Sequence, residues 1–444
     1  MRVFAIQYHL DVRHASSYDT YRDAMRCLVE ALVLPHVEPG RPTLVVFPES
    51  IGLVTLATGQ RGLGARAQAQ SPLRAVSEAV PLGMGGALLQ LQSAYGPQIA
   101  AYQATFGPVD PRKQVLLAAT DTFARAFSQT FSDIALDYGI YVVAGNNQAR
   151  YRATRDPFEV ALFADPAVLP TDEAYVAVSQ RVTNATFLWG PEIVDPTAPR
   201  GERNLLFRNE KMPLTALELD LLGLDEGPAT GAAALDNARG IEVEGLRLGF
   251  ATSLPAFRYG YPFGERPSGF EACDDLRETY AACMDELGVE VMIQADANPV
   301  RWTATLANGS WQPLEWMSSV WRAVADPTVD FEYNVTPMMN GNLFDLIFDG
   351  QSSITARGAE EPGTHFVGNA TTDASDPPEY AVYAGAKREF LAIAPWSGTG
   401  STREGLAAAA DDLAPRGTRE NRYVETAIYA DLVAKRETGR VGRD

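Results

Sequence analysis

The sequence predicts an α/β fold, because segments with strand-like and helix-like spacing of apolar residues alternate along the chain. A strand over 3–8, a helix over 17–34 and a strand over 43–48 form a first strand–helix–strand unit. A helix over 123–138 and a strand over 140–145 repeat the pattern. The first half of the chain is therefore expected to build a sheet covered by helices.

Individual residues support these elements. Tyr21, Met25 and Leu28 recur at helical spacing, and Gly139 stands where a helix C-cap is expected. The segment 51–120 between the two units is rich in Ala, Gly, Gln and Leu. We predict that it is a helical insertion over the mouth of the functional site.

The second half continues in the same way. Strands are predicted at 173–179 and 182–189. A strand over 246–252, a helix over 271–287 and a strand over 289–294 form another strand–helix–strand unit.

The remaining strands are numerous. They are predicted near 333–336, 352–356, 389–394 and 424–431, with loops at 357–378 and 396–403. One central sheet does not comfortably hold so many strands, whereas two sheets packed face to face with helices outside would bury them all. We interpret residues 1–444 as one enlarged domain with a C-terminal extension, 397–444.

Composition limits the function. A formal net charge of −19 argues against nucleic acid or an anionic membrane surface as partner and favours a small neutral or cationic substrate. No signal peptide and no membrane-spanning apolar run are evident. Three cysteines (Cys27, Cys273 and Cys283) are too few for a disulfide framework, which favours a reducing, cytoplasmic location. The four scattered histidines fit no metal spacing, so neither metal nor cofactor is expected.

Three predicted strand ends carry chemically useful side chains. Glu49 follows a short β-branched run stopped by Pro48, Lys211 lies in Arg208–Pro213, and Ser253 closes the strand over 246–252. Because these strands should be neighbours in the sheet, we expect the three side chains to converge in one pocket.

In this order, Pro48-Glu49, Lys211 and the strand ending at Ser253 resemble the motifs of the nitrilase superfamily of carbon–nitrogen hydrolases. The resemblance implies a four-layer α-β-β-α sandwich and a homodimer or larger assembly. It places Ser253 where the family keeps its catalytic Cys. The stretch from Lys211 to Glu218 resembles the one in which a second glutamate follows the family's lysine.

This resemblance implies roles for four residues in cleaving a small non-peptide amide or nitrile. Glu49 would be the base, Lys211 the cation that stabilises the oxyanion, Glu218 the residue that orients them and Ser253 the nucleophile. A buried Glu–Lys pair can also be a plain structural ion pair.

The serine leaves alternatives open. A hydroxyl forms no anion near neutral pH, a carboxylate is a poor base for it, and Lys211 would have to lose its proton to act as base. Leu254-Pro255 also puts the tight turn of a nucleophile in doubt. The chain is thus either a hydrolase or an inactive member that binds an amide, nitrile or acid metabolite or serves as a partner subunit. A third alternative is that Ser253 was introduced in place of another residue in order to trap a substrate. Cys273 and Cys283, which we expect to pack on a helix face, are the other nucleophile candidates.

Overall fold

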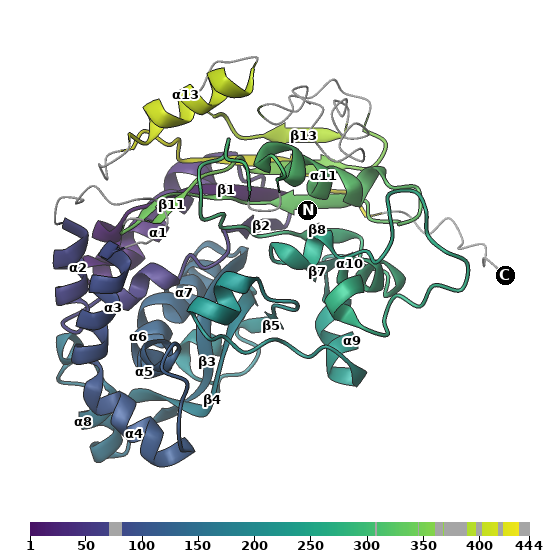
Figure 1. Cartoon of the computed structure of the whole chain (residues 1–444). Helices are drawn as coiled ribbons and strands as arrows, with labels where there is room; N and C mark the ends of the chain where they lie inside the picture. The colour runs from purple at the N-terminus through teal and green to yellow at the C-terminus, as the bar shows by residue number, and fades with distance from the viewer. Residues whose placement is uncertain are drawn as a thin grey trace.

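The computed structural model describes residues 1–70, 82–306, 309–344, 346–359, 367, 389–396, 402–415 and 421–434. Two β-sheets lie face to face, and helices cover their outer sides (Figure 1). The predicted α/β class and four-layer α-β-β-α sandwich are confirmed. Most of the loops predicted at 357–378 and 396–403 lies outside the described residues.

The first sheet has the strand order β11-β10-β1-β2-β3-β4-β5, with β14 also paired to β1. Its strands are β1 (Arg2–Leu10), β2 (Thr43–Val46), β3 (Tyr141–Thr154), β4 (Ala174–Trp189), β5 (Leu205–Glu210), β10 (Met339–Leu343), β11 (Leu346–Phe348) and β14 (Thr426–Asp431). Strands β1, β2 and β3 are parallel, whereas β4 and β5 continue the sheet antiparallel. The prediction of two strands over 173–179 and 182–189 was wrong. Both segments belong to β4, because its partner β3 is long enough to pair with it throughout.

The second sheet has the order β13-β12-β9-β8-β7-β6. Its strands are β6 (Ile241–Val243), β7 (Leu246–Phe250), β8 (Val291–Ile293), β9 (Tyr333–Thr336), β12 (Ser353–Ala356) and β13 (Phe390–Ile393). The central strands β7, β8 and β9 are parallel, so their carboxyl ends lie at one edge.

The side chains of β1 point alternately to the two faces of the sheet and show how the layers form. Val3 and Ala5 lie in the apolar layer between the sheets, together with Leu248 of β7. Phe4 and Ile6 point to the opposite face, where they pack under the helices. Successive side chains of a strand point to opposite faces, so a strand that is apolar throughout can fill both layers at once.

The helices are α1 (Tyr18–Leu32), α2 (Leu63–Gln70), α3 (Leu82–Ala94), α4 (Gly96–Phe106), α5 (Gln114–Ala118), α6 (Thr120–Phe123), α7 (Gln129–Tyr138), α8 (Pro157–Phe163), α9 (Gly231–Arg239), α10 (Leu276–Glu286), α11 (Gln312–Ala325) and α13 (Arg403–Leu413). Ser17 caps the start of helix α1, and its hydroxyl accepts the N–H of Thr20. Helix α7 ends at the left-handed Gly139, as expected. The predicted helix 123–138 is interrupted by a π-helical turn at Ala124–Ser128.

The segment 51–120 is helical in its described part and contributes α2 to α5. Figure 1 places these helices on one side of the molecule, with α9 and α10 on the opposite side. That the segment is an insertion, and that the chain is one domain with an extension at 397–444, stay predictions. Within the described residues, no helix is long and apolar enough to cross a membrane.

Candidate active site

Glu49 lies just past the carboxyl end of β2, behind Phe47 and Pro48, and its side chain is buried. Its position requires a close approach to β3. A Cβ on residue 145 would lie 3.1 Å from the backbone N of Ser50, so glycine there leaves room for the turn. The buried carboxylate needs partners, because an unpaired buried charge is strongly unfavourable.

Lys211 supplies one of those partners. It follows β5 directly, and its Nζ lies 2.7 Å from Oε1 of Glu49 and 2.9 Å from Oε2 of Glu218. The Lys211 residue is only 3% exposed, and Glu49 and Glu218 are 5% exposed each. The predicted trio Glu49, Lys211 and Glu218 is therefore a closed ion-pair network inside the protein.

Asn184 completes this network from β4. Its amide nitrogen donates to Oε1 of Glu49 and to Oε1 of Glu218, each at 2.6 Å. Glu218 belongs to the π-helical turn η7 (Leu217–Leu221), and its Oε2 accepts the backbone N–H and the hydroxyl of Thr215, both at 2.8 Å. These contacts fix both carboxylates relative to Lys211.

The environment separates the pKa values of the two glutamates. Burial raises the pKa of Glu49, and the Lys211 ammonium only partly opposes it. Burial also acts to raise the pKa of Glu218, but Lys211 and the Thr215 N–H outweigh it, so that pKa is lowered. For Lys211, burial favours the neutral form, yet Glu218 and Glu49 outweigh it and raise its pKa. Of the two carboxyl groups, Glu49 therefore has the higher pKa, and the environment of Lys211 favours its ammonium form.

Ser253 comes from the other sheet, three residues past the end of β7, and is half-buried. Its φ of 60° and ψ of −116° make a sharp turn into the short 3-10 helix Leu254–Phe257. Ser50, beside Glu49, also has a positive φ of 55°. Such conformations are rare outside glycine and concentrate at functional sites. Leu254-Pro255 thus follows a tight turn at Ser253.

A direct contact joins the two sheets beside the site. The hydroxyls of Thr186 in β4 and Thr252 lie 2.8 Å apart, and both residues are buried. Glu49, Lys211 and Ser253 line one cavity of about 500 Å³, with Leu217 and Ala297 among its other walls. The expected convergence is present, but its stated reason was wrong. β2 and β5 are separated by β3 and β4, and Ser253 belongs to the second sheet.

Asp296 is a site residue that the sequence analysis missed. It follows β8 and is fully buried, and neither carboxylate oxygen makes a hydrogen bond of ordinary geometry within the described chain. Burial raises its pKa well above the ordinary value, and the Glu49 charge adds to this, while Ser253 and Gln294 face it and oppose the shift. Its position at a strand end beside that of Ser253 was the available signal.

Two further residues of the cavity wall were not among the predicted site residues. Asn298 and Trp316 line the cavity, and the side-chain nitrogen of each is buried without a hydrogen-bond acceptor among the described residues. Buried donors normally have partners, so these two are suited to a ligand acceptor.

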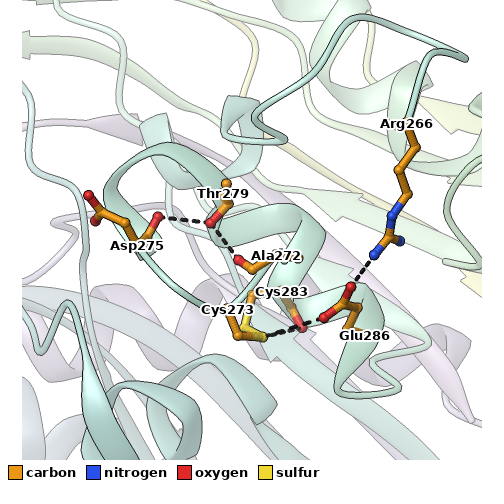
Figure 2. Close-up of a disulfide and its surroundings, with 7 residues drawn as sticks. All are labelled: Arg266, Ala272, Cys273, Asp275, Thr279, Cys283 and Glu286. Carbon is orange, nitrogen blue, oxygen red and sulfur yellow. Dashed lines mark hydrogen bonds and ion pairs between the residues drawn. A yellow bond between two sulfur atoms is a disulfide. The ribbon is translucent and has the colours of Figure 1, made fainter. Parts of the chain in front are cut away.

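Cys273 and Cys283 form a disulfide, as Figure 2 shows, and neither is a free thiol. They were expected to pack as separate residues of one helix. Helix α10 instead begins at Leu276, after the Asp275 cap, so Cys273 lies in the preceding turn and reaches back to the helix. The pair is thus no candidate nucleophile, and the cysteine count no longer supports a reducing compartment. The cytoplasmic location stays a prediction.

No protein-family model and no curated protein matches this chain. Among solved structures it is similar to an amidase from Nesterenkonia sp. AN1 that carries acrylamide on its active-site cysteine, with 14% identity over 80% of this chain and 85% of that chain and a TM-score of 0.36. A variant of that amidase, described as a nitrilase-superfamily protein, gives 14% identity, coverages of 80% and 83% and a TM-score of 0.36. A carbon–nitrogen hydrolase from Helicobacter pylori G27 has 11% sequence identity over 80% of this chain and 82% of that chain, with a TM-score of 0.41. Similarity at this level assigns no role to any residue here.

Proposed function

We propose that this chain hydrolyses a carbon–nitrogen bond in a small non-peptide amide or nitrile, with Glu49, Lys211, Glu218 and Ser253 as the working residues. The observation that carries the proposal is that Glu49, Lys211 and Ser253 line one cavity, with Glu218 paired to Lys211 behind them. A hydroxyl on a sharp, positive-φ turn faces the same space as a buried carboxylate paired with an ammonium. Nucleophile, base and cation are the three groups that acyl transfer needs.

For an amide, the Oγ of Ser253 bonds to the carbonyl carbon while its proton passes to Glu49. The Lys211 ammonium stabilises the negative charge that develops on the carbonyl oxygen. Glu49 then gives the proton to the nitrogen as the carbon–nitrogen bond breaks and ammonia leaves. Water attacks the acyl ester with Glu49 as base again, which releases the acid and restores Ser253.

The pKa shifts favour this division of roles. The raised pKa of Glu49 makes it a stronger base than an exposed carboxylate. The raised pKa of Lys211 speaks against a neutral lysine as base, since the amine would have to lose its proton beside two carboxylates. In this scheme Glu218 and Asn184 are positioning residues that hold Lys211 and Glu49 in place.

A second candidate is a binding protein for an amide, nitrile or acid metabolite, or a partner subunit. It is favoured by the serine itself, because with Lys211 held as an ammonium only a carboxylate is left to deprotonate a hydroxyl of high pKa. The unpartnered Asp296 carboxyl beside Ser253 and the spare donors of Asn298 and Trp316 would suit such a ligand.

Ammonia release by the purified protein across small amides, nitriles and carbamoyl compounds distinguishes the two candidates. Hydrolysis that Ser253→Ala abolishes supports catalysis. Ser253→Cys should raise turnover about a hundredfold or more, because a thiolate forms readily beside Lys211. Adding Glu49→Gln to this variant should abolish the increase in turnover. Ligand binding without turnover in either form would favour the binding protein, and no binding at all would refute both candidates.

A further inference from the structure

A second cavity, of about 120 Å³, adjoins the site cavity, and the two share Glu49, Leu217 and Ala297 in their walls. It also contains Glu218 and Asn147 among its lining residues. The polar groups of the site therefore form one end of this second space, which we call the apolar chamber.

The rest of the described lining is almost entirely hydrocarbon. Helix α3 contributes Leu88 and Leu91, and α5 contributes Leu116. Leu343 and Phe348 come from the β10–β11 hairpin, a separate part of the chain. Ligand sites are typically concave and apolar with a few polar groups at one place, which is the distribution found here.

The hairpin turn supports a ligand role for this wall. Phe344 has a φ of 58°, a conformation that is strained for a bulky residue, yet its side chain is buried in the chamber wall. Two leucines of η7, Leu217 and Leu221, also line the chamber while remaining 41% and 43% exposed. They give the chamber an apolar edge open to solvent.

A charged ligand group finds little in the chamber to pair with it. Glu49 and Glu218 are both bound to Lys211. Arg112 is paired with Asp110 at 2.6 Å and donates to the backbone oxygen of Leu219 at 2.9 Å. Burying an unpaired charge is costly, so the lining selects an uncharged group.

We propose that the apolar chamber binds an aliphatic acyl chain of medium length, so that the substrate is a primary amide or nitrile with its polar head at Ser253 and Glu49. This inference rests on the proposed function and names its substrate class. The shared residues Leu217 and Ala297 are the passage along which the chain would run from the head into the chamber.

The test is a series of linear amides: acetamide, butanamide, hexanamide and octanamide. Each added methylene should raise kcat/KM about threefold to fourfold until the chamber is filled. Leu88→Trp should fill the chamber and reduce the octanamide-to-acetamide ratio at least about tenfold. Leu89→Trp is the matched control, because Leu89 is the next residue of the same helix but is 67% exposed and outside the lining, and it should keep the ratio.

A second matched pair guards against a misfolded Leu88→Trp variant. Leu221→Glu places a charge in the chamber wall and should lower the ratio, whereas Leu219→Glu, 38% exposed and outside the lining, should keep it. Hydrolysis of acetamide with no preference for longer chains would overturn the inference and leave the proposed function intact. If neither these amides nor the corresponding nitriles are hydrolysed, the proposed function fails, and displacement of the neutral dye Nile red decides the chamber's role. Displacement of the dye by octanamide but not by acetamide supports acyl-chain binding in the chamber, provided that Leu88→Trp or Leu221→Glu abolishes it. If octanamide displaces no dye from the wild type, the inference is overturned.

Discussion

Replacing Lys211 with methionine should lower the free energy of unfolding by about 3–5 kcal/mol at neutral pH, because it leaves two buried carboxylates without their shared cation. The Lys211 residue is 3% exposed, and its ammonium lies within 2.9 Å of both Glu49 and Glu218. Asn184 would be the remaining partner that the two carboxylates share. For a chain of 444 residues this loss corresponds to a decrease in Tm of about 3–5 °C.

The loss should depend on pH in a defined direction. The raised pKa of Lys211 means that its stabilisation is present below its ordinary value of 10.5 and is lost as the pH rises through the folded value. The lowered pKa of Glu218 means that its contribution is present above 4.5 and is lost as the pH falls through the folded value. The free energies of unfolding of wild type and Lys211→Met, measured in urea, should therefore differ most near neutral pH and less at acidic pH.

Arg22→Met is the control for this measurement, because it breaks an exposed ion pair with Asp19 and should cost about 0.5 kcal/mol or less. A loss below about 1 kcal/mol for Lys211→Met, or one that is equal at about pH 4 and pH 7, would refute the view that the network depends on a buried charge.

Three other predictions concern the acid beside Ser253, the disulfide and the assembly. Wild type should lose stability as the pH rises from 3.8 toward the raised pKa of Asp296, so Asp296→Asn should gain stability relative to wild type as the pH rises above 3.8. A difference in urea midpoint that stays constant with pH would contradict this. Cys273→Ser opens a loop with a sequence separation of 10 and should cost about 2–3 kcal/mol, and dithiothreitol should reproduce the loss in wild type but not in the variant. Light scattering should give at least twice the single-chain mass of 48.1 kDa, and a mass equal to one chain would disprove the expected homodimer.

The sequence was informative where periodicity and strand ends carry the signal. Glu49 is identifiable because it closes a short apolar strand, and the large number of predicted strands indicated two sheets. The spacing could not show that Ser253 lies on the sheet opposite both of them. Asp296 was missed although it stands at a strand end, because an isolated carboxylate after a strand resembles an ordinary loop residue and its burial is seen only in the structure. The Cys273 disulfide depends on where α10 begins, which helical spacing locates poorly.

The position of the site between the sheets constrains how it can work. Glu49, Lys211 and Asn184 belong to the first sheet, whereas Ser253 and Asp296 belong to the second. The apolar layer and the Thr186–Thr252 contact hold these two sets together. Catalysis is sensitive to displacements of about 1 Å, so in the mechanism that we propose packing between the sheets would set the distance from the Ser253 hydroxyl to Glu49. If that mechanism operates, a substitution that opens a cavity in the layer should reduce the rate of hydrolysis by more than its cost in stability alone explains.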